Sequence, residues 1–142
     1  MRMWPIKFKK GSVVLVVGGG TGIGRELVYK YASRGCPVVV SDKSEKQLES
    51  VVHRCNNDFK NSDVLPFVAN PNSEAEVATL IDFTSKAFGR IDIVILAGGV
   101  EVLSLFEDLN DFSDLHLTAE QNLFDQVRIT RAALPWLKRS FG

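Results

Sequence analysis

The fold of this chain is decided by the stretch Val13-Val14-Leu15-Val16-Val17-Gly18-Gly19-Gly20-Thr21-Gly22-Ile23-Gly24-Arg25-Glu26. Its opening valine-rich run is typical of a buried strand, and the residues from Gly22 onward follow a helical pattern. A glycine-rich turn between a strand and a helix presents backbone N–H groups and the positive end of the helix to a phosphate. A turn without a ligand is the alternative, but so many glycines cost conformational entropy that a simple turn does not require. The sequence therefore predicts a phosphate-binding loop.

The rest of the chain alternates short apolar runs with longer helical patterns. Strands are expected at Val13–Val17, Pro37–Ser41, Val64–Ala69 and Ile91–Leu96. Helices are expected at Gly22–Arg34, Ser44–Asn56 and Ser73–Phe88, with a final helix after a loop from Gly98 to about Asp114. This alternation predicts right-handed βαβ units and an α/β fold with a parallel sheet. The expected strand order is 3-2-1-4, an incomplete Rossmann-type doubly wound sheet.

Three expectations concern how these elements are buried and bounded. Pro66 cannot donate to a neighbouring strand, so the third strand should lie at an edge of the sheet. The fourth strand, Ile91–Leu96, is almost continuously apolar and is expected to be buried on both faces. The final helix should turn one stripe inward, formed by Leu123, Val127, Thr130, Leu134 and Leu137. One Rossmann domain over residues 13–142 is predicted, after an N-terminal segment of residues 1–12.

Composition excludes several classes of function. The 142 residues are 45% hydrophobic and 24% charged, with a formal net charge of zero, so no basic excess points to nucleic acid. No apolar run is long enough for a membrane span, and the basic N-terminal residues lack the apolar core of a signal peptide. Cys36 and Cys55 fit neither a metal-ligand spacing nor a disulfide framework, so no metal site is expected. These features predict a cytoplasmic protein with reduced cysteines.

Three features converge on a dinucleotide. In the loop, Gly18 would make the tight turn, Gly22 would admit the pyrophosphate, and Gly24 would let the helix pack against the strand. At the end of the second strand, the Asp42 carboxylate would accept hydrogen bonds from the adenosine ribose and repel a 2′-phosphate, so NAD is predicted over NADP. The adjacent Lys43 weakens this discrimination. Alternatively, Asp42 caps the next helix, although Ser44 could do the same.

The third feature is Ala97-Gly98-Gly99 at the end of the fourth strand. Small residues there leave room for the nicotinamide and its ribose across the strand ends, although an ordinary turn would also use them.

Several motifs resemble the short-chain dehydrogenase/reductase family. The run Val17–Glu26 is similar to its Thr-Gly-x-x-x-Gly-x-Gly signature, with Val17 in place of Thr. Residues 88–99 resemble the strand that ends in Asn-Asn-Ala-Gly, with Leu96 and Ala97 in place of both asparagines. Asn122-Leu123 followed by Thr130–Pro135 is similar to the family's long central helix. Gly-Ile-Gly-Arg-Glu, Leu48–Cys55 and Ala-Leu-Pro-Trp-Leu-Lys are similar to the 11β-hydroxysteroid dehydrogenase-like group.

The resemblance implies hydride transfer between alcohols and ketones with NAD(P), and dimerisation through the central helix. It places Asn122 at the helix asparagine of the catalytic tetrad, and Asn70 where an aspartate commonly contacts adenine. The predicted cofactor-binding residues are Gly18, Gly20, Thr21, Gly22, Ile23, Gly24, Asp42, Asn70, Ala97, Gly98 and Gly99.

The family's other catalytic residues are not found in these 142 residues. Family members use a Ser and a Tyr-x-x-x-Lys pair for proton transfer, but the two tyrosines here, Tyr29 and Tyr31, lie in the first helix, and neither has a Lys four residues later. Without a positioned acid or base, the chain as given is expected to be inactive alone. It is either the cofactor-binding half of a dehydrogenase or a stand-alone, non-catalytic dinucleotide-binding or interaction module. The gene sequence beyond Gly142 would separate the two.

Overall fold

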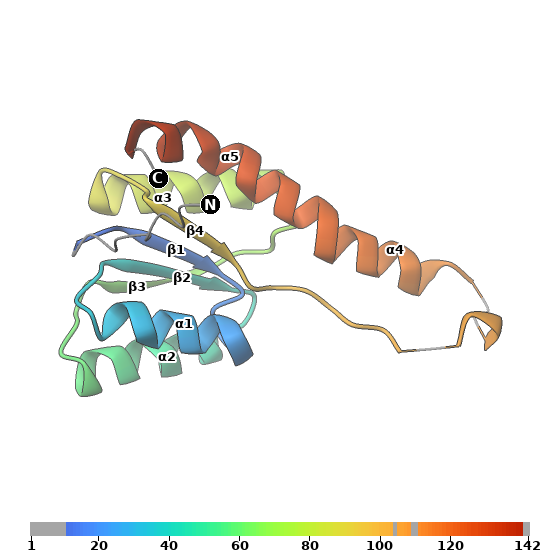
Figure 1. Ribbon diagram of the computed structural model, residues 1–142, viewed down its shortest axis with the longest axis horizontal. Helices are drawn as coiled ribbons and strands as arrows, with labels where there is room; N and C mark the ends of the chain where they lie inside the picture. The colour runs from blue at the N-terminus through green and yellow to red at the C-terminus, as the bar shows by residue number, and fades with distance from the viewer. Residues whose placement is uncertain (1–10, 104, 109–110, 141–142) are drawn as a thin grey trace, which may run out of the picture.

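The computed structural model describes residues 11–103, 105–108 and 111–140 (Figure 1). Most of the expected N-terminal segment, residues 1–12, lies outside these ranges. Among the described residues, no helix combines the length and apolar character that a membrane crossing needs.

A parallel sheet of four strands forms the centre of the molecule (Figure 1). The strands are β1 (Val14–Val17), β2 (Val38–Asp42), β3 (Val64–Val68) and β4 (Ile93–Leu96). Their order is β3-β2-β1-β4, which confirms the predicted 3-2-1-4 topology. Val14 aligns with Val38 on one side and with Ile93 on the other, so the strand ends lie level with one another. Pro66 lies in the edge strand β3, as expected.

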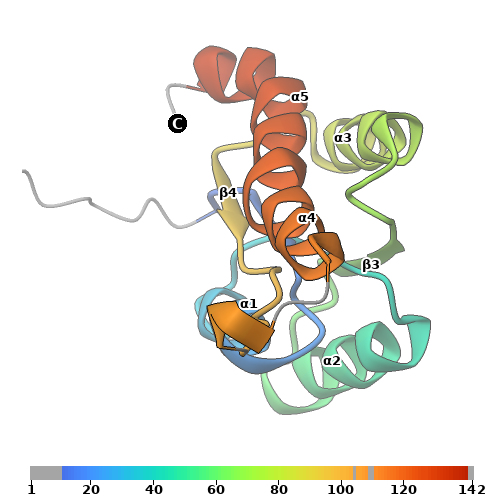
Figure 2. The same cartoon turned by 90° about the vertical axis from the view of Figure 1, so that its right-hand side faces the viewer.

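Two layers of helices cover the sheet (Figures 1 and 2). Helices α1 (Gly22–Ala32) and α2 (Glu45–Asp58) cover one face, and α3 (Glu74–Phe88) and α5 (Asp125–Ser140) cover the other. After β4, the chain passes through the short helix η1 (Phe106–Asp108) to α4 (Ser113–Ala119). A π-helical turn, η2 (Glu120–Phe124), joins α4 to α5 without a break. Figure 1 shows that α4 projects beyond the carboxyl ends of the strands.

The central strands alternate their side chains between two buried clusters, as the two-residue repeat of a strand requires. Val14, Val16 and Val40 pack against α1 and α2. Leu15, Val17 and Val39 pack on the other face against α3 and α5. Cys36 and Cys55 are both free thiols and belong to the buried cluster that contacts α1 and α2.

The expectation that the fourth strand is buried on both faces is wrong. All four residues of β4, Ile93–Leu96, are only half-buried. The reason is position, because β4 is an edge of the sheet and only β1 pairs with it among the described strands. The apolar run therefore presents part of its surface outside the core.

The inward stripe predicted for the final helix is also wrong. Leu123, Val127, Thr130 and Leu134 are exposed, and Leu137 alone among the five packs against the core. The buried positions of α5 are Asp125, Ile129 and Ala133, which repeat every four residues along a different face. The prediction followed the larger apolar side chains, whereas the inward stripe begins with a carboxylate and contains a small alanine.

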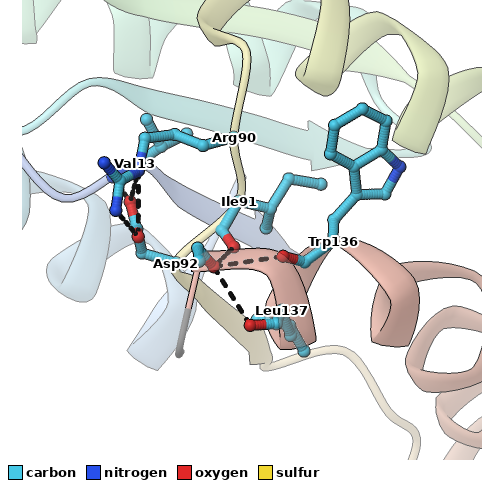
Figure 3. A network of polar contacts seen from close by, with 7 residues as sticks. Val13, Arg90, Ile91, Asp92, Trp136 and Leu137 are labelled. Atoms are coloured by element: carbon cyan, nitrogen blue, oxygen red, sulfur yellow. Dashed lines mark hydrogen bonds and ion pairs between the residues drawn. The ribbon is translucent and has the colours of Figure 1, made fainter.

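Polar contacts fasten the beginning of β4 to its neighbours (Figure 3). The Asp92 carboxylate accepts a hydrogen bond of 2.8 Å from the backbone N–H of Val13 and forms an ion pair with Arg90. At the far end of α5, the Ser140 hydroxyl donates to the carbonyl oxygen of Ile91 at 2.5 Å. These contacts fix both β1 and α5 against β4 at the amino end of the sheet.

Candidate functional site

A cavity of about 230 Å³ lies at the carboxyl ends of the strands. Neighbouring strands β1 and β4 lead to helices on opposite faces of the sheet, and such a switch point is where doubly wound folds bind ligands. Six predicted site residues line this cavity: Gly18, Thr21, Asp42, Ala97, Gly98 and Gly99. The structure therefore brings together the ends of the first, second and fourth strands, as the sequence predicted.

The glycine loop joins β1 to α1 with very little space. Gly18 has a φ of +77°, and a Cβ atom there would lie 2.6 Å from the Cα atom of Gly98. A Cβ atom at Gly24 would overlap the carbonyl oxygen of Gly18. Both positions thus need glycine for close backbone approach, and Gly18 also needs it for its left-handed conformation.

Helix α1 begins beside the cavity. Its N-cap residue, Thr21, lines the cavity, and its first turn contains no acidic residue. Gly22 and Ile23 are the first helical residues but do not line the cavity. Gly22 has a φ of +51°, and nothing lies within 4 Å of the position that a Cβ atom would take there, while the Ile23 side chain is 79% exposed. The start of α1 thus keeps its positive end open to an anion from outside.

Asp42 holds the glycine loop and the beginning of α2 together. One oxygen, Oδ2, accepts a hydrogen bond of 2.9 Å from the backbone N–H of Gly20. The other, Oδ1, accepts from the N–H groups of Lys43, at 2.8 Å, and Ser44, at 3.4 Å. The Ser44 hydroxyl makes no capping bond, and the Asp42 oxygens bond only to N–H groups that precede Glu45, so neither side chain caps the first turn of α2 as the alternative expected. Asp42 also lines the cavity.

Asn122 lies in the π-helical turn η2, and its side chain forms two hydrogen bonds to the backbone just after β4. Its Oδ1 atom accepts from the Val100 N–H at 2.9 Å, and its Nδ2 atom donates to the Val100 carbonyl oxygen at 2.8 Å. A Cβ atom at Gly99 would lie 2.7 Å from Asn122 Oδ1, so glycine is required for this close approach. Asn122 does not line the cavity itself. Its contacts position the cavity wall formed by Gly98 and Gly99.

Asn70 lies beside the cavity rather than in its wall. Its side-chain Oδ1 atom accepts from the backbone N–H of Asn72 at 3.2 Å, and its own N–H donates to Glu76 at 2.8 Å. Its neighbours Ala69 and Pro71 are the residues that line the cavity from this loop.

Sequence reasoning missed the wall contributed by the final helix. That wall consists of Gln121, Asp125, Gln126 and Ile129. Gln126 also donates to the Gly98 carbonyl oxygen at 3.2 Å. The signal that could have found this wall is the i, i+4 repeat of Asp125 with Ile129, which the larger leucines obscured.

Asp125 is a buried carboxylate in this wall, with only 5% of its surface exposed. Its Oδ1 atom pairs with Arg128 at 2.8 Å, and Arg128 also pairs with Glu120. Burial raises the pKa of Asp125 above its usual value, while the positive charges of Arg128 and Lys43 oppose this increase. Lys43 lines the same cavity.

The titratable groups usually used for proton transfer lie elsewhere. Tyr29 is buried on the opposite face of the sheet, where its ring contacts Phe59 at a centroid distance of 6.0 Å. His53, on α2, contacts Asn57. No tyrosine or histidine lines the cavity among the described residues, nor do the described ranges contain a cluster of three potential metal ligands.

Known proteins share both the sequence pattern and this geometry. The family described as short chain dehydrogenase matches residues 12–142. A relative named 11-beta-hydroxysteroid dehydrogenase A from Sesamum indicum is 32% identical over 93% of this chain, and one of the same name from Arachis hypogaea is 33% identical over the same share. Each alignment covers only 38% of the relative, so this chain spans about two fifths of their length.

A solved structure, the hydroxysteroid dehydrogenase from Escherichia coli, has the same arrangement. It superposes with a TM-score of 0.84 at 25% identity, covering 92% of this chain and 54% of that one. The match over nearly all of the residues, the strand order and the glycine loop agree, and the chain belongs to the short-chain dehydrogenase family.

Proposed function

We propose that this chain binds a nicotinamide dinucleotide, with NAD(H) preferred over NADP(H), at the carboxyl ends of its strands. The observation that carries the proposal is the glycine cradle. Gly18 and Gly24 allow the end of β1, the start of α1 and the end of β4 to approach without side chains between them. The first turn of α1 contains no acidic residue, which leaves the positive helix end for a phosphate.

Each part of the proposed site has a physical task. Gly20, Thr21, Gly22 and Ile23, at the start of α1, would face the pyrophosphate through their backbone. Asp42 would receive the adenosine ribose hydroxyls, with Asn70 beside the adenine, while Ala97, Gly98 and Gly99 would border the nicotinamide end. The cavity, at about 230 Å³, is smaller than the roughly 300–1,000 Å³ of a typical ligand pocket. It therefore holds part of an extended dinucleotide, and the rest lies along the loop.

The whole protein is proposed to interconvert an alcohol and a ketone, with steroids or other lipophilic alcohols as the substrate class. A bound nicotinamide would supply hydride transfer. The described residues position the cofactor, and Asn122 shapes the wall beside it through Val100. No proton-transfer group is assigned to these residues, since the Tyr29 side chain packs on the other face of the sheet.

A cofactor titration of an Asp42→Ala variant tests the proposed site. The unsubstituted protein should bind NADH more tightly than NADPH. The variant should lose about 10- to 100-fold in NADH affinity, because a hydrogen bond to a charged group contributes about 1.5–3 kcal/mol. Its preference for NADH over NADPH should shrink as well, because a 2′-phosphate no longer meets a carboxylate. Isothermal titration calorimetry measures both affinities.

Asp58→Ala is a matched control, because Asp58 is an exposed carboxylate on α2 that pairs with Arg54. This control should bind both cofactors as the unsubstituted protein does. Absence of NADH binding by protein with an intact circular dichroism spectrum would contradict the proposed function.

A second candidate function is a stand-alone binding or interaction module without catalysis. The observation that favours it is the exposed apolar surface on the final helices, formed by Leu115, Leu117, Leu123, Phe124, Val127 and Leu134.

We propose that a second copy of the chain covers part of this apolar surface, as the family resemblance implies. Light scattering should then give twice the monomer mass at micromolar concentration, and a Val127→Lys variant should give the monomer mass. A monomer mass for the unsubstituted protein would contradict the dimer.

The proposed compartment is the cytoplasm, supported by the two free cysteine thiols. Cell fractionation that recovers the protein in an oxidising compartment would contradict it.

A further inference from the structure

A charged residue in the cavity wall has no role in the function proposed so far. Asp125 begins α5 and occupies the first position of its inward stripe, ahead of Ile129 and Ala133. Taking a carboxylate out of water costs several kcal/mol of free energy, and the attraction within a single ion pair seldom exceeds this cost. An apolar residue would suit the stripe better for stability. The position of Asp125 in the wall of the cavity therefore points to a role toward the ligand.

The charges that line the cavity are few. Asp42, Lys43 and Asp125 are the charged residues among the described ones in its wall, so Lys43 is the cation available there. Lys43 follows Asp42 directly at the end of β2, next to the place proposed for the adenosine ribose. A 2′-phosphate on this ribose adds negative charge and needs a cation to balance it. Lys43 is the residue that could supply this balance.

Arg128 does not serve the same purpose. It pairs with Asp125 through Nη1 and with Glu120 through Nη2. It borders the separate groove between α3 and α5, together with Val77 and Phe124, and does not line the cavity. Its charge is balanced by two carboxylates, and of these three residues only Asp125 lines the cavity. Lys43 and Asp125 line the same cavity, and the positive charge of Lys43 opposes the increase in the Asp125 pKa that burial causes.

We propose that Asp125 is a second selectivity residue of the cavity: its carboxylate offsets the positive charge of Lys43, so that the cavity rejects the additional phosphate of NADP(H). This inference rests on the proposed dinucleotide-binding function and assigns part of the NAD(H) preference to the final helix. In this arrangement, Asp42 excludes the 2′-phosphate at its own position, and Asp125 prevents Lys43 from compensating.

The test compares NADH and NADPH binding to an Asp125→Asn variant by fluorescence titration. The ratio of the two affinities should shift toward NADPH by about tenfold, because the charge of Lys43, no longer offset by a carboxylate, can then balance the additional phosphate. The control Asp82→Asn makes the same charge change on the exposed side of α3, where Asp82 pairs with Lys86, and should leave the ratio unchanged.

A double-mutant cycle separates the proposed role from general electrostatics. In a Lys43→Met background, Asp125→Asn should shift the ratio by no more than about twofold, since no cation remains to be released. A full shift in this background would overturn the proposal, as would an unmoved ratio in Asp125→Asn itself. If the single variant Asp125→Asn does not fold, the double variant Asp125→Asn with Arg128→Gln removes both charges of this ion pair. It should give the same shift in the affinity ratio.

The possible outcomes separate the role proposed for Asp125 from the dinucleotide-binding function on which it rests. Binding of both cofactors with an unmoved ratio would overturn the role of Asp125 and leave the dinucleotide site intact. Binding of neither cofactor by folded, unsubstituted protein would overturn the proposed function and this inference with it.

Discussion

Replacing Gly18 by Ala should lower the free energy of unfolding by about 2–5 kcal/mol and remove most dinucleotide binding. Two effects add at this position. The left-handed φ of +77° is strained for a residue with a Cβ atom, and that atom would overlap the backbone nitrogen of Gly98. Backbone cannot move aside as a flexible side chain can, so β1 and the end of β4 must separate. Urea denaturation and an NADH titration measure the two consequences.

Gly35→Ala is the matched control for this change. Gly35 has a nearly identical φ of +72°, but nothing lies within 4 Å of the position its Cβ atom would take. It should therefore lose only the strain of about 1–2 kcal/mol, with NADH affinity unchanged. Equal losses in the two variants would show that close approach to Gly98 is not what makes Gly18 necessary.

Replacing Asn61 by Ala should lower the free energy of unfolding by about 2–4 kcal/mol, because buried polar groups lose their partners. The Asn61 side chain is buried, and its Nδ2 atom donates to the carbonyl oxygens of Ala32 and Cys36 at 3.0 and 2.9 Å. Its Oδ1 atom accepts from the Asp63 N–H at 3.0 Å. These bonds tie the end of α1 to the segment before β3. Urea denaturation measures the loss.

An Asn57→Ala variant provides the comparison. Asn57 is exposed on α2 and bonds to the side chain of His53, so its replacement should change stability by no more than about 0.5 kcal/mol. Similar stability losses for Asn57 and Asn61 would contradict the importance of the buried bonds.

The strand order could be predicted because each strand and each turn has its own local sequence pattern. The first strand, Val14–Val17, is apolar throughout, and the second, Val38–Asp42, opens with three valines before Ser41 and Asp42. Glycine or polar residues come at the edge where ligands bind. The right-handed crossover rule then leaves few arrangements for four strands. Pro66 even specified which strand lies at an edge.

The final helix could not be predicted in the same way. Helical periodicity gives the angle between residues, but the choice of inward face depends on what the helix packs against. Here the sheet accepts Ala133 and Ile129, and a salt bridge to Arg128 makes Asp125 tolerable on the same face. Of the leucines in the predicted stripe, Leu123 and Leu134 are exposed. The cavity wall that this helix provides could therefore not be predicted from the sequence, whereas the opposite wall, formed by the strand ends, could.

The role of Asp42 lies between these cases. Its place at the end of β2 could be read from the sequence, but its bond to the Gly20 N–H could not, because Gly20 is distant along the chain and approaches only after folding. Asn122 is similar, since the motif located it but only the structure shows its paired bonds to Val100.

The π-helical turn η2 has a consequence for how α4 and α5 relate to each other. A π-helical turn contains one more residue than an α-helical turn, so residues before it are rotated by about 100° relative to an uninterrupted α-helix. Asn122 lies within this turn and reaches Val100, while Asp125 and Ile129 just after it face the sheet. In evolutionary terms, η2 is a place where one residue can be inserted into the helix. Such an insertion rotates the side chains of α4 about the helix axis and leaves the packing of α5 on the sheet unchanged.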